Sequence, residues 1–197
     1  MPPSAEVRPL ADVVQEGARV AALASSERVP LKLLGGVGVH LICPSARRPP
    51  LLRQYKDLDF ATTNRYRTAV ERLLIAAGYK PDKKFNTLHG SQRMLFWDDV
   101  NSRQVDIFID KFHLCHSIDL RGRLDGKLPS LPPADLLLTK LQIVQINVKD
   151  LIDATALLIN HPLTAGDGEG TNINYILSLA SADWGLWRTI TYNIAKL

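Results

Sequence analysis

The feature that most constrains the fold of this chain is a pair of strand-like runs, RMLFWDD at 93–99 and QVDIFID at 104–110, separated by VNSR. Two such runs joined by a short polar turn predict a β-hairpin. In the second run, aliphatic residues at every other position alternate with Asp106, Phe108 and Asp110. Because alternate side chains of a strand point to opposite faces, we expect a sheet with one aliphatic face and one face that carries Asp106.

Strands and helices alternate before this hairpin, and helical patterns alone follow it. Strands with interspersed helices, then helices alone, predict the α+β class, with a mixed sheet, flanking helices and a helical C-terminal half. We expect the tail helices to pack Trp184 and Trp187 against the main body. The expected strands are 30–36 and 57–62, and the expected helices are 9–27, 37–43, 66–79, 136–148, 149–162 and two in the tail, hinged near Asp183.

Acidic residues gather on the second expected strand, in QYKDLDFATT. Asp57 and Asp59 are one residue apart, so their side chains project to the same face. Like charges on one face raise each other's energy unless a cation lies between them. With Asp106 on a neighbouring strand, three carboxylates could hold two divalent cations, and magnesium prefers oxygen ligands. Two such ions would activate an attacking hydroxyl and neutralise a leaving pyrophosphate.

A glycine pair, Gly35 and Gly36, stands between the first strand and the following helix. Glycines there let backbone N–H groups approach a phosphate at the helix N-terminus. The G-x-x-x-x-G-K-[ST] pattern of a P-loop is absent from the sequence. Taken singly, a glycine pair is usually a turn, and an Asp-x-Asp pair often lies on a solvated strand face. Their order along the chain, followed by a third strand with an acid, favours a phosphate-handling site.

In this order the residues resemble the core of the nucleotidyltransferase superfamily. LLLTK, which ends at Lys140, and KDLID, with Lys149, Asp150 and Asp153, are similar to two later motifs of the AbiEii-like and MenT-type nucleotidyltransferase toxins. The resemblance covers roughly residues 31–160. It implies a nucleotidyltransferase fold, with a catalytic core and N-terminal helix in residues 1–130, and a helical region in residues 131–197 that completes the active site.

The resemblance implies a magnesium-dependent enzyme of the EC 2.7.7 type, which transfers NMP from an NTP to the 3′ end of tRNA. That modification would block aminoacylation and translation, so the chain would be a toxin with a cognate antitoxin protein as partner. Tyr55 stands where the family often has a serine or threonine. The implied catalytic residues are Asp57, Asp59, Lys140 and Asp150; the metal ligands are Asp57, Asp59 and Asp106; the nucleotide-binding residues are Gly35, Gly36, Arg53, Lys56 and Lys140.

Two of these residues also have structural interpretations. By spacing alone, Lys140 lies at the edge of its helix's apolar stripe, where a lysine commonly covers the core with its stem and extends its ammonium to water. Asp150 could be the N-cap of a helix over 151–160, with Asp153 in the first turn.

Charge and composition narrow the setting of the activity. The formal net charge of +4 makes a polyanionic partner plausible, and Arg47, Arg48, Lys83 and Lys84 are candidate RNA contacts. The two cysteines suit a reducing compartment, and the N-terminus shows no signal-peptide pattern, so we expect a cytoplasmic protein. No apolar run approaches bilayer length, so no membrane span is expected.

Two other functions are compatible with the sequence. An enzyme of the same fold could use a small-molecule or protein acceptor in place of RNA. The chain could also be a catalytically silent binding module, in which the acids merely solvate a strand face. Under that interpretation, magnesium and NTP would not stabilise the fold.

Overall fold

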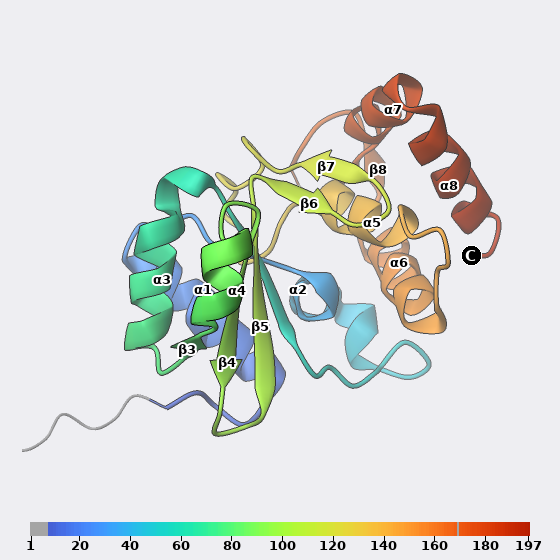
Figure 1. Ribbon diagram of the computed structural model, residues 1–197. Helices are drawn as coiled ribbons and strands as arrows, with labels where there is room; N and C mark the ends of the chain where they lie inside the picture. The colour runs from blue at the N-terminus through green and yellow to red at the C-terminus, as the bar shows by residue number, and fades with distance from the viewer. Residues whose placement is uncertain (1–7, 169) are drawn as a thin grey trace, which may run out of the picture.

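A computed structural model describes residues 8–168 and 170–197 of the chain. Its centre is a five-stranded sheet in the order β1-β2-β5-β4-β3, in which β2 and β5 are parallel and the other neighbouring pairs are antiparallel (Figure 1). The expected α+β class, with a mixed sheet, flanking helices and a helical C-terminal half, is confirmed. The strands are β1 (Lys32–Leu34), β2 (Leu58–Thr62), β3 (Lys80–Pro81), β4 (Arg93–Asp98) and β5 (Arg103–Ile109).

The predicted hairpin is confirmed as β4 and β5, which pair in antiparallel register from Asp98 opposite Arg103 onwards. On its other side, β5 runs parallel to β2, and this register sets Asp59 directly opposite Asp106. Directly opposite residues of neighbouring strands point to the same face. The sheet therefore brings the two acids together, as the alternating pattern predicts.

Helices flank this sheet on both faces, and the helices of the C-terminal part of the chain lie to one side of it (Figure 1). The short elements β3, α4, the β6–β7 hairpin, the β8–β9 pair and two 3₁₀ turns are not among the elements expected from the sequence. The helices are α1 (Val13–Ser26), α2 (Gly35–Ile42), α3 (Arg67–Ala76), α4 (Lys83–His89), α5 (Pro133–Leu141), α6 (Val148–Asn160), α7 (Ile173–Ala182) and α8 (Trp184–Ile194), and the remaining elements are β6 (Lys111–His113), β7 (Ser117–Asp119), β8 (Leu163–Thr164), β9 (Thr171–Asn172) and 3₁₀ turns at Pro44–Arg47 and Asn64–Tyr66.

The two faces of the sheet belong to different hydrophobic clusters. Leu58 and Phe60 of β2 pack with Ile107 of β5 against α1 and α3. On the other face, Ala61 and Phe108 belong to a cluster that also contains α5, α6, α7 and α8. The C-terminal helices thus share a core with the strands, and the division into residues 1–130 and 131–197 stays a prediction.

Two expectations about the C-terminal half are wrong. The helix expected over 136–148 ends at Leu141, and Val144, which was part of the expected apolar stripe, is 56% exposed. A separate helix starts at Val148, after the Asn147 cap. Trp184 and Trp187 do not pack on the main body, with 73% and 47% of their surfaces exposed. The face of α8 that is buried instead carries Leu186 and Ile190, which are one helical turn apart.

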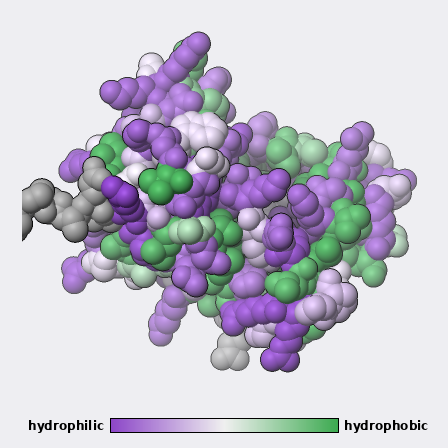
Figure 2. Space-filling view, turned by 90° about the horizontal axis from the view of Figure 1, so that it is seen from below, coloured by the Kyte–Doolittle hydropathy of each residue, from purple (hydrophilic) through white to green (hydrophobic). Residues whose placement is uncertain are grey.

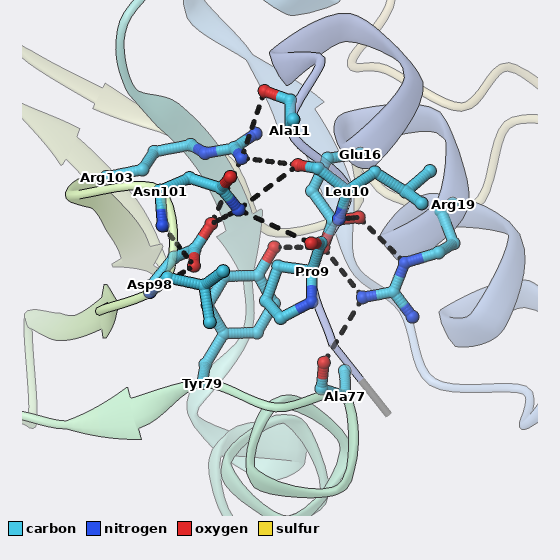
Figure 3. Close-up of polar contacts among 11 residues, drawn as sticks. Pro9, Leu10, Ala11, Glu16, Arg19, Ala77, Tyr79, Asp98, Asn101 and Arg103 are labelled. Atoms are coloured by element: carbon cyan, nitrogen blue, oxygen red, sulfur yellow. Dashed lines mark hydrogen bonds and ion pairs between the residues drawn. The ribbon is translucent and has the colours of Figure 1, made fainter. Parts of the chain in front are cut away.

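A buried polar network fastens the start of α1 to the sheet (Figure 3). The fully buried carboxylate of Glu16 accepts hydrogen bonds from the Tyr79 hydroxyl, from Arg19 and from the backbone N–H of Leu10. Beside it, Arg103 donates to the Leu10 carbonyl at 2.5 Å. Buried charges are tolerated when their hydrogen-bonding capacity is met in this way. Among the described helices, none combines the length and hydrophobicity that a membrane span requires.

Candidate active site

Three acids predicted as metal ligands lie close together on the face of the sheet that carries Asp59 and Asp106, which is called the carboxylate face below. Asp59 is in β2 opposite Asp106 in β5, and Asp57 comes two residues earlier, just outside the strand. Within residues 8–168 and 170–197, neither Asp57 nor Asp59 has a side-chain hydrogen bond or ion pair, whereas Asp106 has both.

Asp59 is in an electrostatically unfavourable position. Burial, and then the charge of Asp106, raise the pKa of the Asp59 carboxyl to about 6, against a smaller opposing effect of Lys140. A carboxyl group whose ionised form is destabilised in this way gains from a nearby cation. Its oxygens, left without protein donors, have the chemistry that Mg²⁺ prefers.

Asp106 is held by protein groups. Its Oδ1 accepts from Arg93 Nε at 2.7 Å, and its Oδ2 accepts from Gln104 Nε2 at 2.7 Å. With these oxygens so engaged, no set of three His, Cys, Asp or Glu side chains in the part of the chain that the structure describes is arranged to hold a metal ion. The donor set of Asp57, Asp59 and Asp106 fits Mg²⁺ in charge and in oxygen chemistry.

The predicted glycine pair forms the N-terminus of α2, immediately beside the acids. Gly35 has a φ of +65°, and a Cβ atom on it would lie 2.2 Å from Asp59 Oδ2, so only glycine fits there. No side chain caps this helix end, which leaves its first N–H groups available to an anion. A Cβ atom on Gly36 would lie 2.0 Å from Arg53 Nη2, which adds a cation at the same place.

A chain of ion pairs joins Arg53 to the C-terminal helices. Arg53 donates two hydrogen bonds to Asp153, at 2.8 Å and 2.6 Å. Asp153 in turn lies 2.9 Å from Lys140 Nζ, which also contacts Asp150 Oδ1 at 3.0 Å. Burial lowers the pKa of Lys140, but Asp153 and Asp150 more than offset this, so the net direction is upward and the ammonium stays charged. Burial also opposes ionisation of Asp153, but Arg53 and Lys140 outweigh it and lower that pKa.

These contacts decide two of the structural alternatives. Lys140 does not extend its ammonium to water: its side chain is 10% exposed and carries two ion pairs. Asp150 is not the N-cap of α6, because Asn147 occupies that position and accepts from the Asp150 N–H. The expected helix start was therefore too late, and Asp150 lies in the first turn.

A cleft of about 830 Å³ adjoins the acids and is lined by Lys56 and Asp57, by the start of α1 and by the β4–β5 turn. Lys56 is exposed there. Seen from below, this side of the molecule is largely hydrophilic, with scattered apolar groups (Figure 2). Such a surface suits a polar ligand.

The same cleft is lined by the predicted Arg53 and by Tyr55, and also by His40 and Arg103, for which no sequence motif indicated a role. The rings of His40 and Tyr55 meet edge to face with their centres 5.3 Å apart, and the Arg53 guanidinium lies 4.3 Å from the centre of the Tyr55 ring. His40 Nδ1, the Tyr55 hydroxyl and Arg103 Nη1 are buried without a hydrogen-bond partner in the described residues. Buried polar atoms are rarely left unpaired in folded proteins, so the walls of the cleft carry unmet hydrogen-bonding capacity just below its surface.

The four candidate RNA contacts do not form one surface. Arg47 donates to the carbonyls of His40 and Leu41 at the end of α2. Arg48 is exposed beside it, and Lys83 and Lys84 are exposed on α4. The loop that carries Arg47 and Arg48 lies beside α6, whereas α4 lies beside β4, toward the opposite edge of the sheet (Figure 1). An RNA that touched both pairs would have to span the carboxylate face.

Comparison with known proteins adds one structural likeness. No family model matches the chain, and no curated protein sequence matches it. Among solved structures, the chain is similar to the solution structure of the antibiotic-resistance factor ANT(2″)-Ia, with a TM-score of 0.48 and 11% sequence identity over 93% of this chain and 91% of that one. The chemistry of this chain is therefore inferred from its own side chains.

Proposed function

We propose that the chain is a nucleotidyltransferase that transfers NMP from an NTP to the 3′ end of tRNA. The observation that carries the proposal is the contact between Gly35 and Asp59, which sets the uncapped N-terminus of α2 against the carboxylates. A site for anions and a site for cations thus adjoin. A nucleoside triphosphate bound with Mg²⁺ satisfies both.

In the proposed reaction, an acceptor hydroxyl oxygen forms a bond to the α-phosphorus, the bond from that phosphorus to pyrophosphate breaks, and the hydroxyl proton passes to solvent. The α2 N–H groups and Arg53 bind the phosphates, and Lys140 adds a compact positive charge. Mg²⁺ held by Asp57, Asp59 and Asp106 would lower the pKa of the hydroxyl and neutralise charge on the departing pyrophosphate. Asp150 and Asp153 keep Lys140 charged and in place.

The biological setting is part of the same proposal. The family resemblance supports a tRNA acceptor, a block on translation and a cognate antitoxin protein. The excess of basic residues supports RNA binding, with Arg47, Arg48, Lys83 and Lys84 as candidate contacts. Both cysteines are free thiols, which supports action in the cytoplasm.

The test is incubation of the purified protein with total tRNA, Mg²⁺ and each of the four α-labelled NTPs in turn. We expect one or more NTPs to label tRNA, and Asp59→Asn to reduce the rate at least ~1,000-fold because the central ligand loses its charge, a loss of about 4 kcal/mol in transition-state stabilisation. Asp99→Asn, at an exposed aspartate of the β4–β5 turn, is the matched control and keeps the wild-type rate.

Other outcomes identify the rivals. If tRNA stays unlabelled while label enters protein or pyrophosphate is released, the acceptor is not tRNA. If no NTP is consumed and Mg²⁺ with NTP does not raise the melting temperature, the chain is a silent binding module, because a ligand at 100 times its Kd stabilises a fold by about 2.7 kcal/mol.

A further inference from the structure

A second hollow, of about 600 Å³, lies on the carboxylate face of the sheet. It is formed between α4, the end of β5 and the β6–β7 hairpin, away from the Gly35–Arg53 side of the acids. Arg93 belongs both to its wall and to the ion pair with Asp106, so this one side chain connects the hollow with the carboxylates. Aromatic and basic side chains line it: Phe85, His89, Arg93, Phe108, Lys111 and Arg121.

Aromatic rings and a guanidinium provide flat surfaces in this hollow. The rings of Phe85 and His89 lie 4.8 Å apart, in a tilted arrangement. The Arg93 guanidinium lies 5.2 Å from the centre of the Phe108 ring and 6.0 Å from that of Phe85. Rings and guanidinium groups of this kind are surfaces on which an unpaired base stacks.

Three cationic side chains line the same hollow: Arg93, Lys111 and Arg121. Arg93 is paired with Asp106 and Arg121 with Asp119, whereas Lys111 is exposed and has no hydrogen bond or ion pair among the described residues. Asp110 is the single acid among its described lining residues, and one of its oxygens already accepts from the Asn64 N–H at 3.0 Å. Cations interleaved with rings recognise the backbone and bases of single-stranded nucleic acid.

We propose that this hollow binds the unstacked 3′-terminal nucleotide of single-stranded RNA, with its base on Phe85, its phosphate at Lys111 and Arg121, and its ribose at Arg93, the ion-pair partner of Asp106. The inference rests on the proposed function, since it names where the acceptor of that reaction binds. The volume falls in the range of about 300–1,000 Å³ that small-molecule sites occupy. The NTP phosphates are assigned to the opposite side of the acids, so both substrates can be bound together.

The test measures binding of a 5′-fluorescein-labelled single-stranded trinucleotide of RNA by fluorescence anisotropy, without Mg²⁺ or NTP, so that no transfer takes place. We expect Lys111→Glu to weaken binding about 10-fold and Phe85→Leu at least ~5-fold, because a stacked base contributes about 1–3 kcal/mol. The control Arg72→Glu reverses one exposed charge on α3, against the aliphatic face of the sheet, and stays within about two-fold of wild type.

A ring-retaining variant, Phe85→Tyr, separates stacking from damage to α4, because it binds as wild type does if the ring is what the base needs. Equal affinities for Lys111→Glu, Phe85→Leu and Arg72→Glu would overturn the assignment of this hollow. Unlabelled AMP that competes as well as unlabelled trinucleotide would overturn the RNA assignment in favour of a free nucleotide.

Failure of this inference is distinguishable from failure of the proposed function. If the trinucleotide binds as described but no NTP labels it when Mg²⁺ is added, the reaction falls and the binding site stands. If labelling proceeds and Lys111→Glu leaves the KM for the trinucleotide unchanged, the proposed reaction is supported and the proposed binding site is wrong.

Discussion

The two faces of the central sheet are built from the same strands and differ in every property that matters for chemistry. On one face, Phe60 and Ile107 are fully buried between α1 and α3. One position away in the same strands, Asp59 and Asp106 are turned to the other face and carry the charges. Both faces are partly covered by helices, but the second also carries two hollows, one lined by Asp57 and one by Arg93, the partner of Asp106.

This difference shows how a small fold can keep unpaired acids in a stable place. The aliphatic face fixes the backbone of β2 and β5, so the acids need not stabilise anything themselves. Elsewhere in the molecule the buried acid Glu16 accepts hydrogen bonds from the Leu10 N–H, from Arg19 and from the Tyr79 hydroxyl (Figure 3). Asp59 has none among the described residues, and unmet carboxylates of this kind are typical of functional sites.

The largest effect on the aliphatic side is expected from Phe60→Ala. Removing a fully buried phenylalanine leaves a cavity, so we expect the free energy of unfolding to fall by about 4 kcal/mol. Urea denaturation measures this change. Transferase activity per folded molecule should stay within about two-fold of wild type, and a large loss of activity in the folded fraction would mean that the two faces are not separable.

A smaller effect is expected from Lys140→Met on the charged side. The substitution removes the cation from Asp150 and Asp153, and breaking a buried ion pair costs about 3 kcal/mol of unfolding free energy. The KM for NTP should also rise at least ~10-fold, which steady-state kinetics would show.

The matched control for Lys140 is Lys80→Met, which breaks the exposed ion pair with Asp99. Exposed pairs contribute less than about 1 kcal/mol, so the unfolding free energy should barely change. Equal losses for Lys80→Met and Lys140→Met would show that burial does not distinguish the two pairs.

The smallest of the three effects concerns Asp59→Asn in metal-free protein. The pKa of Asp59 in the folded chain is raised to about 6, above its value in the unfolded chain, so its ionisation destabilises the fold. The destabilisation is complete above about pH 6 and is lost progressively as the pH falls from about 6 to about 4. We therefore expect Asp59→Asn to stabilise the chain by about 2 kcal/mol at pH 8 and by about half as much at pH 5. Urea denaturation in EDTA at both pH values tests this, and a gain that is the same at pH 5 and pH 8 would contradict it.

Much of the fold could be predicted because its signals are local. The hairpin over 93–110, the strand–glycine–helix unit at Gly35 and Gly36 and the alternation that places Asp106 on the face of Asp59 depend only on neighbouring residues. The ends of the C-terminal helices were harder. A helical stripe shows which residues share a face, but not whether another element covers it, and so Trp184 was expected to be buried and is not.

The missing parts of the candidate site depend on residues far apart in the sequence. The pair of Arg93 with Asp106 follows from the register of β4 against β5, which the sequence does not specify to one residue. Neither His40 beside Tyr55 nor the hollow at Phe85 has a sequence signal, because each arises where separate elements meet. The short helix α4, which supplies Phe85, carries no clear apolar period, and so the sequence does not predict it.

Asp153 gives the molecule an evolutionary constraint. It connects Arg53, which comes before the first acidic strand, with Lys140 in the C-terminal half, and it is 1% exposed. If recombination replaced the C-terminal half, Arg53 would lose its ion-pair partner unless the incoming segment carried an acid at the same position. We therefore expect the two halves to be inherited together, because the ion pairs that hold Arg53 and Lys140 depend on Asp153.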